Sequence, residues 1–331
     1  MTWPIIGHDW AVTQLRQSLA HSRVGHAYLF CGPPQIGKTH LARLWAQALT
    51  CPQPDPPCGQ CSACHKIAHG AHPDIRFVAG QGAGQSIKIE QVRALQREAV
   101  LLPYEGPRRV FILLDFDRAT VEAANSLLKT LEEPPSHVVL ILTAVDAEAL
   151  PSTVVSRCQR LDLRPAPLGL VRDALQAEGA PPDRAELIAR LAGGRVGWAL
   201  EAWRQPDILH QREQDLDRLQ SLLTVGRVER FAFAEKASRD LPACRRRIAY
   251  WLGWWRDLLL LSSHNEEHIV NLDRLEELRS QQRGLTMAQL WAVLEALQKT
   301  AARLEANVNA RLALESLMLA LPRRADSGPV A

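Results

Sequence analysis

Residues 30–43, FCGPPQIGKTHLAR, narrow the range of possible folds more than any other part of the chain. Four residues satisfy the pattern G-x-x-x-x-G-K-[ST]: Gly32, Gly37, Lys38 and Thr39. They follow an apolar run at 26–32 that predicts a buried strand, and they precede a helical pattern at 38–50. In this context the backbone N–H groups surround phosphate oxygens, while Lys38 reaches the β/γ phosphates and the Thr39 hydroxyl ligates Mg²⁺. A glycine-rich turn without a ligand is the alternative.

The rest of the first half alternates between strand and helix patterns. Further strands are predicted at 74–80, 109–115, 137–144 and 158–163, and further helices at 86–102 and 122–133. The run at 109–115 is almost wholly apolar, as a central parallel strand covered on both faces should be. The alternation predicts an α/β fold of the P-loop type, with a mainly parallel sheet between two layers of helices.

The strand signal ends after residue 165, and the remainder is helical. We expect a P-loop domain over 1–165, a small helical domain over 166–207 and a larger helical domain over 208–322, followed by a disordered tail over 323–331. Trp251, Trp254 and Trp255 lie in one apolar stretch after three arginines at 245–247. We interpret the aromatics as core and interface packing, and the arginines as a solvated face. The alternative is stacking of nucleic-acid bases on these rings.

Charge and hydropathy restrict the class of protein. The formal net charge of +3 over 331 residues argues against binding of nucleic acid through bulk charge. The first ten residues lack the pattern of a signal peptide. The most apolar stretch, residues 248–263, is interrupted by Arg256 and Asp257 and is shorter than a membrane span. We therefore expect a cytoplasmic protein.

Four of the seven cysteines are clustered. Cys51, Cys58, Cys61 and Cys64 have the spacing C-x₆-C-x₂-C-x₂-C. Four thiolates at this spacing suit tetrahedral Zn²⁺ and leave no position for water, so we predict a structural zinc site. The alternative is a group of reduced free cysteines, and a nearby histidine (His65, His69 or His72) could replace a ligand.

Hydrolysis of ATP also needs a strand-end carboxylate on the metal and a group that polarises water. Asp115 follows the predicted strand and suits the first role. The next residue is Phe116, and Asp117 can take over only if the backbone bulges there. The sequence therefore predicts nucleotide binding with weak or absent hydrolysis.

Five segments together resemble a known family: HAYLFCGPPQIGKT, the four-cysteine module, HPD at 72–74, NSLLKTLEEPP at 125–135 and LPSTVVSRC at 150–158. NVNARLALESLML near the C-terminus adds a sixth. The chain resembles the delta-prime subunits of the bacterial DNA polymerase III clamp loader, within the AAA+ clamp-loader ATPases. The resemblance implies an AAA+ domain, a helical lid and a helical collar that joins subunits in a hetero-oligomeric ring.

The resemblance also implies roles for single residues. Arg157 matches the arginine that reaches across an interface to the ATP of a neighbouring subunit. Thr143 matches a nucleotide-sensing position after the fourth strand. Trp198 stands where the motor subunits, gamma and tau, carry a sensing arginine, and Arg195 is a poor substitute. The motor type also has glutamate in place of Phe116, so these departures favour delta-prime.

The function we expect is that of an accessory subunit that helps load the sliding clamp onto primed DNA and has no polymerase activity of its own. Its partners would be the gamma/tau and delta subunits, with the clamp and the DNA reached through the complex. One alternative is an active gamma/tau-type ATPase. Another, of a different class, is a stand-alone zinc-containing DNA-binding module.

Overall fold

The computed structural model describes residues 3–82, 85–306 and 308–323. The chain forms two compact units, one of Met1–Ala174 with Ala192–Ala199 and one of Leu175–Leu191 with Leu200–Ala331. This division runs through the segment 166–207, for which we predict a separate lid domain, and the three-domain organisation stays a prediction. The predicted disordered tail, apart from Arg323, lies outside the described residues.

The first unit is built on a five-stranded sheet in the order β2-β3-β4-β1-β5. The strands are β1 (Ala27–Cys31), β2 (Ile75–Val78), β3 (Arg109–Leu113), β4 (Val138–Ala144) and β5 (Gln159–Asp162), and all neighbouring pairs are parallel. The register places Phe30 beside Thr143 and Cys31 beside Asp162. The predicted α/β fold with a parallel sheet is confirmed: β1, β3 and β4 are buried between helices, whereas the outer strands β2 and β5 are partly exposed.

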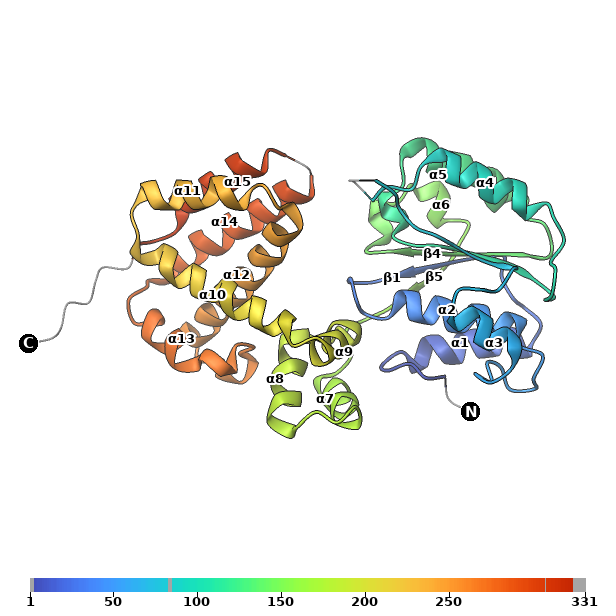
Figure 1. Ribbon diagram of the computed structural model, residues 1–331, viewed down its shortest axis with the longest axis horizontal. Helices are drawn as coiled ribbons and strands as arrows, with labels where there is room; N and C mark the ends of the chain where they lie inside the picture. Colours follow the sequence, from blue (N-terminus) through green and yellow to red (C-terminus); the bar gives the residue numbers. More distant parts are fainter. Residues whose placement is uncertain (1–2, 83–84, 307, 324–331) are drawn as a thin grey trace, which may run out of the picture. The chain divides into compact units, whose positions relative to one another are not determined.

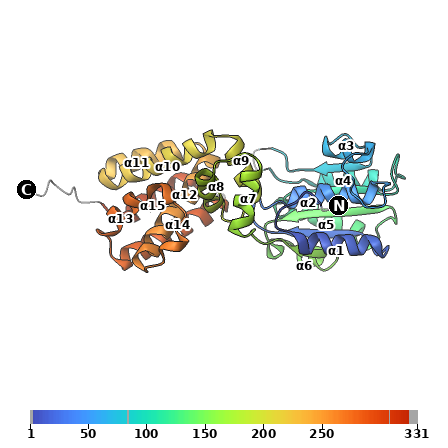
Figure 2. The same cartoon turned by 90° about the horizontal axis from the view of Figure 1, so that it is seen from below.

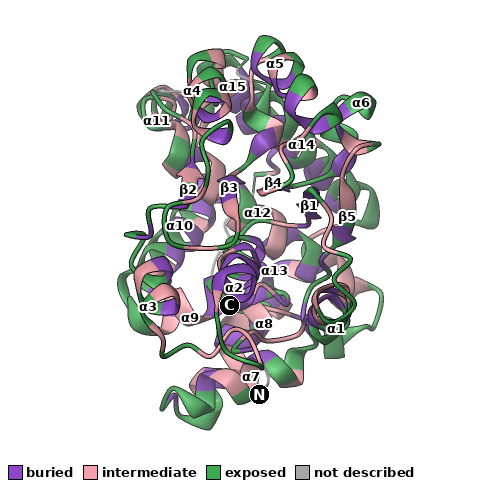
Figure 3. Cartoon of the chain, turned by 90° about the vertical axis from the view of Figure 1, so that its right-hand side faces the viewer, coloured by how far each residue is buried: buried purple, intermediate pink, exposed green. Residues whose placement is uncertain are grey.

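Helices cover both faces of this sheet, as Figure 1 shows. One face carries α1 (Asp9–Ala20), α2 (Lys38–Thr50) and α3 (Ser62–Ala68), packed around Trp45. The other carries α4 (Ile89–Ala99), α5 (Val121–Glu132) and the short α6 (Ser152–Val155), packed around Phe111. In Figure 3, α2 is largely purple because it buries nearly all of its side chains. The phosphate loop therefore lies between a buried strand and a buried helix.

The chain continues through α7 (Leu168–Ala177), α8 (Pro182–Ala192) and α9 (Val196–Arg204). The second unit then contains α10 (Asp207–Thr224), α11 (Arg227–Ala237), α12 (Leu241–Ser262), α13 (Leu275–Gln282), α14 (Met287–Glu305) and α15 (Ala310–Ala320), with short 3₁₀ turns at Glu266–His268 and Leu272–Arg274. α12 packs against α10, α13 and α14, and α15 packs against α11 and α14 (Figure 2).

The core of the second unit contains the three tryptophans of α12. Trp251, Trp254 and Trp255 are fully buried, which confirms their interpretation as core residues, while their part in a subunit interface stays a prediction. The interpretation of the arginines before them as a solvated face holds only in part, because all three are half-buried and have partners within the unit. Arg245 donates to the Leu304 carbonyl at 2.7 Å, and Arg246 and Arg247 contact Asp215. A buried aspartate and a helix end supply these partners, and neither is visible in the local sequence.

A buried arginine joins three helices of this unit. Arg230 of α11 is 6% exposed and donates to the carbonyls of Leu222, Met318, Leu321 and Pro322. The last carbonyls of a helix have no partner within the helix, so a guanidinium among them satisfies several at once. Arg230 thus fastens α11 to the ends of α10 and α15.

Among the helices of the described residues, none has the length and apolar character needed to cross a membrane.

Candidate functional site

The phosphate loop joins β1 to α2 through two glycines with positive φ. Gly32 has φ 149°, and a Cβ there would lie 2.6 Å from the carbonyl oxygen of Leu163. Gly37 has φ 114° and is the N-cap residue of α2, so no side chain covers the helix N-terminus there. Backbone N–H groups at such a helix start form a site for phosphate. The structure therefore gives the four motif residues the context that the motif requires.

Lys38 is folded back onto its own loop. Its Nζ donates to the carbonyls of Gly32 at 2.6 Å and Pro33 at 3.0 Å, and the residue is 6% exposed. Burial lowers the pKa of Lys38, while the nearby Asp115 and Asp117 carboxylates act in the opposite direction. The ammonium group thus lies among the carbonyls of the loop and close to two carboxylates. Thr39 is exposed at the start of α2.

The segment after β3 brings two aspartates, Asp115 and Asp117, close enough to Lys38 to act on its charge. Asp115 has φ 50°, and Phe116–Arg118 form a 3₁₀ turn, so the chain leaves the extended conformation at the strand end. Phe116 points into the core and is 1% exposed, whereas Asp115 is exposed and Asp117 is half-buried. The backbone thus turns after Asp115, which is the condition stated above for a role of Asp117 at the metal. Asp115 and Asp117 are therefore the candidate carboxylates for Mg²⁺.

Thr143 connects this turn to β4. The residue is 1% exposed, and its Oγ1 accepts a hydrogen bond from the Asp115 N–H at 2.9 Å. Because β1 and β4 are neighbours, Thr143 lies beside Phe30, two residues before the first glycine of the loop. The structure thus brings Lys38, Asp115 and Thr143 to one edge of the sheet.

Two residues near the start of α9 occupy the segment of the predicted sensor. Trp198 is 8% exposed, and the Arg195 guanidinium lies over its ring, 5.4 Å from the centroid. Arg195 also donates to the Ala192 carbonyl at 2.8 Å. The arginine is thus engaged with its own turn and with Trp198.

Arg157 lies between α6 and β5. Its Nη2 lies 2.7 Å from a carboxylate oxygen of Glu132, and its Nη1 donates to the Thr153 carbonyl at 2.8 Å. The side chains of Arg157 and Glu132 are 35% and 51% exposed. This is the local pairing expected of an arginine that only supports a loop, but it leaves the guanidinium accessible.

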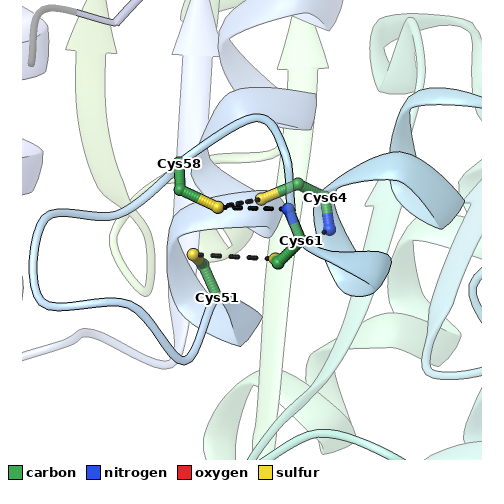
Figure 4. Close-up of side chains that lie close together, drawn as sticks. All are labelled: Cys51, Cys58, Cys61 and Cys64. Atoms are coloured by element: carbon green, nitrogen blue, oxygen red, sulfur yellow. Dashed lines mark hydrogen bonds between the residues drawn. The ribbon is translucent and has the colours of Figure 1, made fainter.

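The four clustered cysteines converge, as Figure 4 shows. Their sulfur atoms all lie within 4.8 Å of one another. The Cys58–Cys64 and Cys51–Cys61 sulfurs are 4.0 Å and 3.9 Å apart. Four sulfurs at about 2.3 Å from a tetrahedral Zn²⁺ would be separated by about 3.8 Å, so the spacing fits the metal.

Backbone donors surround these sulfurs. The N–H groups of Gln60 and Cys61 point at the Cys58 sulfur and lower the pKa of its thiol to about 6. Cys61 is the N-cap residue of α3, and its sulfur accepts from the Cys64 N–H at 3.4 Å. Backbone N–H donors of this kind favour the thiolate form that binds metal.

The cysteine module is attached to the phosphate-loop domain by polar contacts from both sides. Gln47 of α2 donates to the Cys64 carbonyl at 2.8 Å, and the Trp3 indole donates to the Pro56 carbonyl at 3.1 Å. The module is therefore fastened to the helix that follows the phosphate loop.

Sequence reasoning missed two residues that shape this region. His8 is fully buried, and its Nε2–H donates to the Ile36 carbonyl inside the phosphate loop at 2.9 Å. Asp74 of the HPD segment is 1% exposed and accepts from the N–H groups of Tyr104, Glu105 and Gly106. The HPD motif marked Asp74 as part of the resemblance, but its partners lie about thirty residues away.

Comparison with known proteins agrees with this geometry. Residues 7–167 match the family model described as DNA polymerase III, delta subunit. The chain is 32% identical to DNA polymerase III subunit delta' of Bacillus subtilis (strain 168), over 93% of this chain and 94% of that protein. It is also 32% identical to subunit delta' of Pseudomonas aeruginosa, over 94% of this chain and 96% of that protein.

Subunit tau of Bacillus subtilis is 31% identical, over 59% of this chain and 36% of that protein. Similarity to delta' proteins thus extends over nearly the whole chain, while similarity to tau covers a shorter part. A solved DNA polymerase III gamma subunit-related protein from Thermotoga maritima aligns over 93% of this chain and 97% of that chain, at 18% identity and with a TM-score of 0.43.

Proposed function

The chain belongs to the DNA polymerase III subunit delta' family, and from this premise we propose that it works in a hetero-oligomeric ring with gamma/tau and delta subunits. In that ring it helps load the sliding clamp onto primed DNA, in the bacterial cytoplasm. The observation that carries the proposal is the similarity to two delta' proteins over nearly the full length of all three chains. Full-length similarity also favours a ring subunit over a stand-alone zinc-containing DNA-binding module.

The catalytic contribution that we assign to this chain is Arg157, acting on the ATP of a neighbouring subunit. A guanidinium supplied from another chain stabilises the negative charge that builds up on a transferred phosphoryl group. The accessible position of Arg157 supports this role, and its pairing with Glu132 fixes its direction before any partner arrives. Exposed ion pairs are worth about 0–1 kcal/mol, so a phosphate can displace Glu132 at small cost.

The chain's own phosphate loop binds a nucleotide with Mg²⁺ and hydrolyses it slowly or not at all. Gly32, Gly37 and Lys38 would hold the phosphates, Thr39 and Asp115 would serve the metal, and Thr143 would sense the nucleotide. ATP with Mg²⁺ would be a bound ligand of this loop and not a substrate that is turned over efficiently. The reason is that no residue matches the glutamate and the sensing arginine of the motor subunits. Phe116 and Trp198 stand in those positions.

An active gamma/tau-type ATPase is a second candidate, and one specific observation favours it. The 3₁₀ turn at 116–118 leaves Asp117 close enough to Lys38 to act on its pKa. Mg²⁺-dependent turnover by the isolated chain, abolished by Lys38→Ala, would establish that candidate.

The zinc ion has a structural role in this proposal. It would be held by Cys51, Cys58, Cys61 and Cys64, and it would stabilise the fold of the segment between α2 and α3.

The test is the rate of ATP turnover in a loader reconstituted from all its subunits, with clamp and primed DNA present. We expect Arg157→Ala to leave the chain folded and assembled but to slow turnover by the complex severalfold. Arg160→Ala is the matched control, because Arg160 also pairs with a nearby carboxylate, Asp162, at 2.6 Å. Equal turnover with Arg157→Ala and with Arg160→Ala would remove the proposed role of Arg157.

A further inference from the structure

The phosphate loop contains a residue in an unfavourable backbone conformation. Gln35, at the exposed tip of the loop, has φ 60°. This left-handed region is uncommon for residues with a side chain, and residues held there are typically stabilised by their surroundings. The surroundings of Gln35 therefore decide whether the loop keeps this shape.

The contact that holds Gln35 comes from the first turn of α9, 162 residues further along the chain. The Gly197 N–H donates to the Gln35 carbonyl at 2.9 Å. A Cβ built on Gly197 would lie 2.7 Å from the same oxygen, so the approach requires glycine. Both residues belong to the first compact unit.

The start of α9 is itself fixed to the sheet. Gly194 has φ 81°, its carbonyl accepts from the Ala166 N–H at 3.0 Å, and a Cβ on it would lie 2.6 Å from the Ala166 carbonyl oxygen. Three residues before Ala166, the Leu163 N–H donates to the Cys31 carbonyl at 2.8 Å. α9 is thus tied both to the end of β5 and to the loop that follows β1.

The direction of the loop's carbonyls determines the direction of its N–H groups. In a trans peptide the C=O of one residue and the N–H of the next point in opposite directions. Gly197 fixes the Gln35 carbonyl, and His8 fixes the Ile36 carbonyl at 2.9 Å. Holding these two carbonyls from outside orients the N–H groups of Ile36 and Gly37, which are the groups that would meet phosphate oxygens.

We propose that the start of α9 sets the conformation of the phosphate loop through the Gly197–Gln35 contact, and that nucleotide affinity consequently depends on α9. Gly197 is a positioning residue in this arrangement, because it acts on the ligand only through the loop. The dependence of affinity rests on the nucleotide site proposed above, whereas the dependence of loop conformation does not.

The test uses the full chain with Gly197→Ala, and with Gly253→Ala as the matched control. A Cβ on Gly253, within α12, would meet no atom within 4 Å. Hydrogen exchange of residues 35–38 without nucleotide should become faster in Gly197→Ala and stay unchanged in Gly253→Ala. The affinity for a fluorescent ATP analogue with Mg²⁺ should fall roughly fivefold to thirtyfold in Gly197→Ala only.

A second variant separates the contact from general damage to α9. Gln35→Gly removes the conformational penalty at residue 35, so the loop can adjust without help from α9. In the Gln35→Gly background, we expect Gly197→Ala to change exchange and affinity much less than in the natural chain. A full effect of Gly197→Ala in both backgrounds would contradict the proposal.

The outcomes distinguish this proposal from the nucleotide site on which part of it rests. Unchanged exchange of residues 35–38 in Gly197→Ala would overturn the control of the loop by α9. Faster exchange with unchanged affinity would overturn the dependence of affinity on α9. A natural chain that binds no ATP analogue would refute the nucleotide site, and faster exchange in Gly197→Ala would still support the control of the loop.

Discussion

Arg157 and Glu132 join two sequence motifs that are separate along the chain, with 2.7 Å between the guanidinium nitrogen and the carboxylate oxygen. Glu132 belongs to LLKTLEEPP at the end of α5, and Arg157 belongs to SRC after α6. The structure therefore brings the two motifs together, and the ion pair is one contact between them. The Arg157 side chain is 35% exposed, as its proposed role toward a neighbouring subunit requires.

Glu132→Gln tests whether ATP turnover by the loader depends on the Arg157–Glu132 ion pair or only on the guanidinium of Arg157. The exposed pair is worth about 0–1 kcal/mol, so its loss should change ATP turnover by the assembled loader less than about fivefold. Glu133→Gln, the adjacent exposed glutamate, is the control. Turnover as low with Glu132→Gln as with Arg157→Ala would show that the ion pair itself is required, contrary to our assignment.

Loss of a cysteine ligand should release the metal and loosen the segment between α2 and α3. We expect about one zinc ion per natural chain and close to none in Cys61→Ser, because a structural zinc site needs all four ligands. Metal analysis of gently purified protein, combined with hydrogen exchange over residues 51–68, measures both effects. Cys244→Ser is the control, since Cys244 belongs to the second unit, where its sulfur donates to the Ala237 carbonyl, and serine can keep that bond. Zinc retained in Cys61→Ser, or absent from the natural chain, would refute the site.

Asp74→Asn should destabilise the first unit near neutral pH by about 3–5 kcal/mol, because Arg109 would lose its buried partner. Burial opposes the charge of Asp74, but the three backbone N–H donors and Arg109 outweigh it, and they lower the pKa of this carboxyl. The charged form is thus the one that stabilises the fold. Its contribution is complete above the unfolded value of about 3.9 and is lost as the pH falls through the folded pKa.

The measurement is the urea midpoint of unfolding between about pH 3 and pH 7 for the natural chain and for Asp74→Asn. The difference between the two should be constant near neutral pH and should shrink in acid. Asp173→Asn, which changes an exposed aspartate, controls for net charge. A difference that grows as the pH falls would contradict the assigned direction of the shift.

Much of the fold could be predicted because its signals are local. β3 and β4 are buried on both faces, so they read as continuous apolar runs, and Pro134 marks the end of α5. The four cysteines lie within fourteen consecutive residues, so a short turn and one turn of helix suffice to bring them together. The phosphate loop is equally local, since its glycines act on their own backbone.

The contacts that could not be predicted join distant segments through the backbone or through single polar side chains. Gly197 meets Gln35 by a main-chain hydrogen bond, which leaves no mark on residue type beyond the glycine itself. Asp74 binds three N–H groups, and every residue except proline has one. The partner of Arg245 could not be predicted for the same reason, because it is a main-chain carbonyl.

The partners of Arg230 have a consequence for when the second unit can fold during synthesis. Its carbonyl partners at Met318, Leu321 and Pro322 leave the ribosome about ninety residues after it does. Until then a guanidinium that lies in the finished core would have to be buried without these acceptors, which is strongly unfavourable. The second unit is therefore expected to remain open during synthesis and to close only when its last helix emerges, long after the β-sheet of the first unit has been made.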